Sequence, residues 1–180
     1  SGRERGNVSE QDVAHAERLI GRGIFLEDSG DLEGALRCYE DAISSARQYA
    51  RAHLNRGNIL QIQGHLREAL DAYKVALDLQ PDYLGAYVNI GNTHMRLAEP
   101  TDAIIAYQKA LALNAKDVPA TAALAAAQET AIRYAEAVDT YRRCLALDSK
   151  HVAAQLGLAR SLRALEQPEA ALEALRKRPS

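Results

Sequence analysis

Small and apolar residues recur along this chain at the spacing of helix faces. Ala69, Tyr73 and Ala76 are four and three residues apart, so they share one face of a helix. A second such face lies in the preceding segment and comprises His53, Gly57 and Leu60. Strand-forming residues are scarce, whereas alanine is plentiful. The pattern predicts an all-α protein whose helices approach one another closely through small side chains.

Turn and cap signals divide this pattern into ten expected helices. Gly64 is placed to end one helix, and Pro100 and Pro168 occupy a first helical turn, where a missing N–H costs nothing. Ser9 with Asp12 forms a capping pattern for the first helix. The expected helices span residues 10–28, 32–47, 50–63, 66–79, 84–97, 100–113, 118–131, 134–147, 152–165 and 168–178.

The helix pairs repeat with a period of 34 residues. Gly23, Gly57 and Gly91 are separated by this step. Three further series share the register and run through Ala35, Ala69, Ala103, Ala137 and Ala171, through Tyr39, Tyr73, Tyr107 and Tyr141 with Leu175 last, and through Ala42, Ala76, Ala110 and Cys144. Independent series in one register indicate a repeat protein, in which stacked helix pairs share a continuous core.

These residues resemble the tetratricopeptide repeat, as the stretch AYVNIGNTHMRLAEPTDAIIAYQKALALN illustrates. The resemblance implies a right-handed α-solenoid of five 34-residue helix-turn-helix repeats, the last one truncated. Residues 1–15 would form an N-terminal lead and the start of the first helix, and 16–180 the repeat domain. The expected repeats span residues 16–49, 50–83, 84–117, 118–151 and 152–180.

Two departures from the family pattern affect the later repeats. Ala125 and Ala159 stand where the first three repeats carry glycine, and Pro81 is the one proline at a repeat end. We expect the remaining joints to have less rigid turns. The fifth repeat ends inside its second helix, without the polar capping helix that solenoids need. The chain is therefore expected to be a fragment, or to pack its end on something else.

Charge and composition argue against several function classes. The formal net charge of −2 gives no support to nucleic-acid binding, which requires a strongly basic face. No apolar run approaches the roughly 20 residues that a membrane span needs. Cys38 and Cys144 lack metal or redox spacing, so we expect buried free thiols, which fit a reducing, cytoplasmic compartment.

The motifs of enzymes and cofactor-binding proteins are missing from the sequence. Its histidines show no ligand spacing, no glycine-rich phosphate loop follows a strand, and no nucleophile elbow occurs. We therefore expect no metal, no cofactor and no catalytic residues. Function should lie on an extended helix surface instead.

The family resemblance places a binding groove on the first helix of each pair. Its lining stripe consists of the second, fifth, sixth, ninth, twelfth and thirteenth residues of a repeat. Asparagine amides there could bond a peptide backbone, as in the asparagine ladder of O-linked N-acetylglucosamine transferases, which Asn55 and Asn89 match. The candidate peptide-binding residues are Leu54, Asn55, Asn58, Val88, Asn89, Asn92, Met95 and Arg96.

Alternatives remain open at this point. The asparagines could bond neighbouring helices rather than a ligand. A second family mode, the carboxylate clamp, requires groove lysines, and the stripe has none. Charge is acidic at one end of the stripe and basic at the other, which fits solvated faces, an oriented ligand or head-to-tail association. The charged residues concerned are Glu17, Glu27, Asp28, Arg160 and Arg163.

The leading hypothesis is a non-catalytic scaffold that binds a peptide or helix of a protein partner. The second is that the chain is the substrate-recruiting arm of a larger enzyme, such as a glycosyltransferase. The third is a module that self-associates through its terminal helices.

Overall fold

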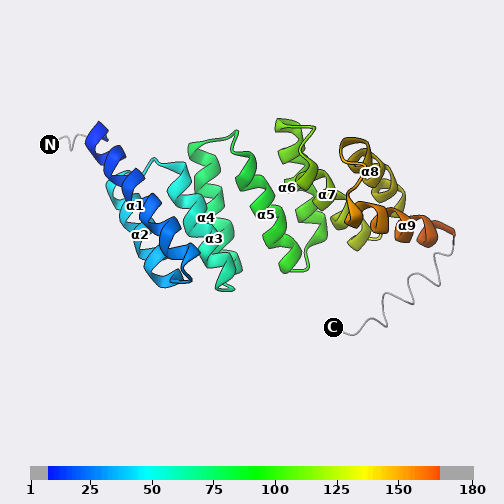
Figure 1. Cartoon of the computed structure of the whole chain (residues 1–180), viewed down its shortest axis with the longest axis horizontal. Coiled ribbons are helices and arrows are strands. Elements are labelled where there is room, and N and C mark those ends of the chain that lie inside the picture. The colour runs from blue at the N-terminus through cyan, green and yellow to red at the C-terminus, as the bar shows by residue number, and fades with distance from the viewer. Residues whose placement is uncertain (1–7, 167–180) are drawn as a thin grey trace. The chain divides into compact units, whose positions relative to one another are not determined.

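The computed structural model describes residues 8–166, and every regular element in that range is a helix. Short turns join consecutive helices (Figure 1). The helices are α1 (Glu10–Asp28), α2 (Leu32–Ser45), α3 (Ala50–Ile62), α4 (Leu66–Leu79), α5 (Leu84–Arg96), α6 (Pro100–Leu113), α7 (Val118–Thr130), α8 (Tyr134–Leu147) and α9 (Val152–Glu166). The expected all-α repeat is confirmed, and its boundaries agree within two residues. The expected tenth helix and Pro168 lie outside the described residues.

Two compact units make up the chain, residues 1–86 and 87–180, and the boundary falls within α5. In the first unit, α1 packs on α2, α2 on α3, and α3 on α4. In the second unit, α6 packs on α7, α7 on α8, and α8 on α9. No helix among residues 8–166 has both the length and the apolar character that crossing a bilayer requires.

Helix ends form through the local signals in the sequence. Ser9 Oγ accepts from Asp12 N, and Asp12 Oδ2 accepts from Ser9 N, both at 3.1 Å, so the expected cap is confirmed. The turn within each helix pair needs one residue with left-handed backbone. Glycine occupies this position in the first two pairs and adopts the left-handed conformation without strain. Alanine and isoleucine occupy it in the next two pairs, where the same conformation is strained. These residues are Gly30, Gly64, Ala98 and Ile132.

The tyrosine series forms the core between the helices, as predicted. All four rings are at most 3% exposed. The two periodic series of small residues that flank them, from Ala35 to Ala137 and from Ala42 to Cys144, are fully buried. Tyr141, for example, packs in a cluster with Ala125, Ala137, Cys144 and Ala154. Cys38 and Cys144 are buried and free.

Glycine permits the close approach of the paired helices. A Cβ added to Gly57 would lie 2.6 Å from Cε1 of Tyr73, and one added to Gly23 would lie 2.5 Å from Cε1 of Tyr39. Such distances are far inside van der Waals contact, so a larger residue at Gly23 or Gly57 must displace the facing ring. The fourth pair differs, since Ala125 packs in one cluster with Tyr141. Gly57 and Gly91 thus continue their helices, although glycine beside asparagine usually signals a turn.

The last described helix departs from the expected contact. Gly157 is buried, and a Cβ added to it would collide with the ring of Tyr141 from the preceding helix pair. Ala159, which was expected to replace the glycine, is exposed. Its expected partner, Leu175, lies outside the described residues. Gly157 therefore allows α9 to pack closely on Tyr141 of the preceding pair. The 34-residue alignment did not predict this role for Gly157.

Replacing Gly57 with valine tests the glycine–tyrosine contact. Gly57→Val should lower the free energy of unfolding by about 1–3 kcal/mol more than Gly21→Val, because overpacking displaces the Tyr73 ring. Gly21 also lies inside a helix, but no atom lies within 4 Å of its added Cβ. The two substitutions share the same helix propensity change, so chemical denaturation of both isolates the contact. Equal losses would contradict the role of Gly57.

Candidate functional site

A cavity of about 340 Å³ lies on the first unit between α1 and the start of α3. Four of its lining residues come from α1 and occupy the second, fifth, sixth and ninth positions of the first repeat, which belong to the expected binding stripe. The lining comprises Glu17, Ile20, Gly21, Ile24, Tyr49 and Arg51. The first-helix face of this unit is therefore hollowed where the stripe was predicted.

The cavity combines an apolar part with groups of both charges. Ile20 is 2% exposed and Ile24 is half-buried, and Gly21 leaves open space above them. The Tyr49 hydroxyl donates to Glu17 Oε1 at 3.2 Å. Burial, together with this hydrogen bond, raises the pKa of Tyr49, so the hydroxyl keeps its proton.

Arg51 supplies a cation to the lining of the cavity. Its side chain is exposed, and its charge acts on both Tyr49 and Tyr83, whose pKa values burial raises. Asn55 follows one turn later on α3 and is half-buried. Neither Arg51 nor Asn55 forms a hydrogen bond or ion pair with another described residue.

Asn58 and Asn92 have an internal partner instead. The Tyr73 hydroxyl donates to Asn58 Oδ1 at 2.8 Å and to Gln61 Oε1 at 3.2 Å. The Tyr107 hydroxyl donates to Asn92 Oδ1 at 2.6 Å. The alternative that groove asparagines bond neighbouring helices is thus realised for this pair of positions.

Glutamate replaces asparagine as the acceptor in the first and fourth helix pairs. Tyr39 donates to Glu27 Oε2 at 2.9 Å, and Tyr141 donates to Glu129 Oε2 at 2.6 Å. Each of the first four repeats carries asparagine at its ninth position or glutamate at its twelfth, a pattern that can be seen in the sequence once the tyrosine contacts are known. The ninth and twelfth residues are Ile24 and Glu27, Asn58 and Gln61, Asn92 and Met95, and Ala126 and Glu129.

The remaining candidate residues differ in exposure. Leu54 is buried at 9% exposure, close to Gly85, and therefore offers a partner little surface. Val88, Asn89 and Met95 are half-buried and Arg96 is exposed, all on α5 of the second unit. Asn55 belongs to the first unit and Asn89 to the second, so the two-rung ladder stays a prediction.

Several of the charges expected at the ends of the stripe are bound within their own units. Arg160 Nε donates to Glu129 Oε1 at 2.7 Å and Arg160 Nη2 to Glu129 Oε2 at 3.2 Å, a two-point contact that Tyr141 joins. Glu27 and Glu17 accept from tyrosines. Head-to-tail association stays a hypothesis, and these three charges also have internal contacts.

Asn92 and Asn58 form a matched pair for testing the tyrosine contacts. Asn92→Ala removes the acceptor of the Tyr107 hydroxyl. The twelfth residue of this repeat is Met95, which cannot replace the amide as Gln61 can in the second pair, so the variant should lose about 1–2 kcal/mol of stability. Asn58→Ala should cost less, because Gln61 still accepts from Tyr73. Urea unfolding of both variants provides the measurement. A larger loss for Asn58→Ala would contradict this assignment.

High pH should weaken the fold through the same tyrosines. Burial raises the pKa of Tyr107 to about 12, whereas an unperturbed tyrosine titrates near about 10. The folded state retains the proton more firmly, so this contribution is complete below about pH 10 and is lost as the pH rises to about 12. Melting temperatures should fall across that range, and less steeply in Tyr107→Phe. An identical slope in that variant would refute the effect.

Comparison with known proteins identifies the repeat. Family models described as TPR repeat and tetratricopeptide repeat match residues 57–97, 84–117 and 131–180, which together exceed half of the chain. A search of curated proteins gave no match.

Solved structures share the fold. The crystal structure of MamA protein has 20% sequence identity and a TM-score of 0.78, and the match covers 91% of this chain and 89% of that one. YrrB, described as a TPR protein with an unusual peptide-binding site, has 24% identity and a TM-score of 0.74, with 93% and 86% covered. The first TPR of Spaghetti (RPAP3), bound to the HSP90 peptide SRMEEVD, has 28% identity and a TM-score of 0.64, with 67% and 95% covered.

The family matches, the helix pairs of both units and the buried tyrosine and small-residue series agree. The fold is an all-α helical-repeat solenoid, and the chain belongs to the tetratricopeptide-repeat family.

Proposed function

We propose that this chain is a non-catalytic scaffold that binds an extended peptide segment of a protein partner on the first-helix face of its repeats. The observation that carries the proposal is the cavity between α1 and α3, which Arg51 lines, with Asn55 one helical turn after Arg51 on α3. Peptide-bound and peptide-binding TPR structures among the similar proteins support the same class of ligand.

The chemistry of the cavity fits a peptide with an apolar and an acidic residue close together. Ile20 and Ile24 offer apolar contact, and Gly21 leaves room for a side chain to enter. The Arg51 guanidinium pairs well with a carboxylate. The Asn55 amide offers both a donor and an acceptor, which match a peptide C=O and N–H. An extended chain advances about 3.3 Å per residue, so neighbouring residues can reach these groups.

Apolar contact must supply much of the affinity. A neutral hydrogen bond contributes about 0.5–1.5 kcal/mol net, so one or two asparagine contacts give weak binding. Burial of apolar surface adds roughly 25 cal/mol per Å². In the second unit, Val88 and Met95 would provide such contacts beside Asn89 and Arg96. Asn92 is exposed and would present its amide NH₂ to the peptide while its oxygen holds Tyr107.

The same site would serve a free-standing scaffold or the recruiting arm of a larger enzyme. Both roles require a peptide on the first-helix face, and both leave catalysis to another domain or protein. The test below therefore addresses the binding step that the two roles share.

A peptide selected from a displayed library against the folded chain provides the probe. Arg51→Ala with Asn55→Ala should weaken its binding about tenfold or more in calorimetry, since two polar contacts are lost. Lys74→Ala is the control, because it removes an exposed cation from α4, the second helix of its pair, and should change affinity less than about twofold.

Adding Asn89→Ala to Asn55→Ala tests the asparagine ladder separately. Further weakening is expected if both amides contact the peptide. Unchanged affinity in the Arg51 and Asn55 double variant, with its helical circular dichroism intact, would refute the proposed site.

A further inference from the structure

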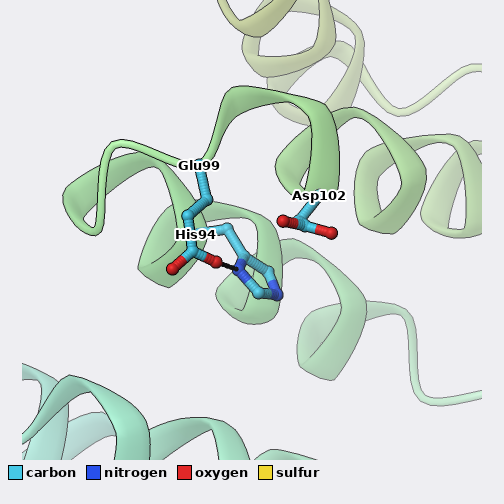
Figure 2. A group of neighbouring side chains, drawn as sticks. All are labelled: His94, Glu99 and Asp102. Carbon is cyan, nitrogen blue, oxygen red and sulfur yellow. Dashed lines mark hydrogen bonds and ion pairs between the residues drawn. The ribbon is translucent and has the colours of Figure 1, made fainter.

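One imidazole and two carboxylates converge at the turn between α5 and α6. His94 lies near the end of α5, Glu99 lies in the turn, and Asp102 lies in the first turn of α6 (Figure 2). One ligand atom from each residue lies within 4.8 Å of the others. His94 Nδ1 and Glu99 Oε2 are 3.0 Å apart. All three residues belong to the second unit.

The distances suit a shared metal ion. Zinc binds histidine nitrogen and carboxylate oxygen at about 2.0–2.2 Å, so two ligands on one tetrahedral ion lie about 3.3 Å apart. The separation of His94 and Glu99 is already close to this value. Asp102 is exposed, so its side chain can rotate and bring its carboxylate closer to His94 and Glu99. A bound ion would take the place of the present hydrogen bond between His94 and Glu99.

Histidine at position 94 is unusual within the repeat. The equivalent residue of the second pair is Leu60, a core residue 4% exposed, and that of the fourth pair is Gln128, whose Oε1 accepts from Thr140 at 2.6 Å. The His94 side chain is 16% exposed. A polar imidazole thus replaces a core residue, and its ring nitrogen points to a carboxylate rather than into the helix contact.

The preceding helix pair contains a similar contact between a histidine and a carboxylate, which provides a control for the test below. His65 Nδ1 and Glu68 Oε1 are 3.8 Å apart, and both side chains are more than half exposed. Glu68 occupies the same repeat position as Asp102. The preceding pair thus offers two possible metal ligands, both exposed. The α5–α6 turn offers three possible ligands, one of them a largely buried histidine.

We propose that His94, Glu99 and Asp102 form a binding site for a divalent transition-metal ion of the zinc type. One imidazole nitrogen and two carboxylates suit Zn²⁺, and the two negative charges are neutralised by the ion. Three protein ligands leave a coordination position for water. Bound metal would tie the end of α5 to the start of α6, on the helix that also carries Met95 and Arg96.

Titration of the metal-stripped full chain with zinc chloride tests the site. Calorimetry should show a site that Asp102→Asn weakens at least tenfold and that Glu68→Gln leaves within twofold. His94→Gln should remove it, and glutamine is the residue that the fourth pair carries in this place. Zinc should also raise the melting temperature of the unmodified chain more than that of Asp102→Asn.

The outcomes are distinguishable even if one variant folds poorly. Asp102 is exposed, so Asp102→Asn should keep the fold if His94→Gln does not. Absence of zinc binding, or equal zinc binding by the unmodified chain and Asp102→Asn, would overturn the proposal and leave the His94–Glu99 contact as a plain hydrogen bond. Neither result depends on the peptide-binding function.

Discussion

The contact between a tyrosine ring and a small residue on the facing helix determines much of this structure. The ring fills the space between paired helices only if the opposite residue is glycine or alanine, as Gly57 is to Tyr73 and Ala125 to Tyr141. Because the ring is buried, its hydroxyl also requires an acceptor. The same tyrosine therefore fixes the helix spacing and the identity of a polar residue on the first helix.

That requirement divides the polar residues of the stripe into two kinds. Asn58, Asn92 and Glu129 accept from tyrosines and have a structural role first. Arg51 and Asn55 make no such contact among the described residues. An unengaged polar group beside a hollow surface is what a ligand can use, whereas an engaged one costs stability when its partner is removed. The proposed peptide site follows from this division.

The α5–α6 turn shows how one repeat can acquire separate chemistry. Replacing a core leucine by His94 would leave a polar ring without a partner, and Glu99 provides that partner at 3.0 Å. Asp102, placed by the first turn of α6, adds a second carboxylate to the same space. The family fold tolerates this change because the turn is at the surface, where water can reach the group.

The sequence alone determined the helices, the 34-residue repeat and the buried tyrosine series, because side-chain positions on a helix follow from its fixed period. It could not decide what each polar side chain bonds to, since that depends on groups brought together from different helices. Only the tertiary structure assigned Asn58 to Tyr73, buried Leu54, and turned Gly157 toward Tyr141. It also joined His94 to Glu99 and Asp102, a group that spans two helices and a turn and so shows no single-helix spacing.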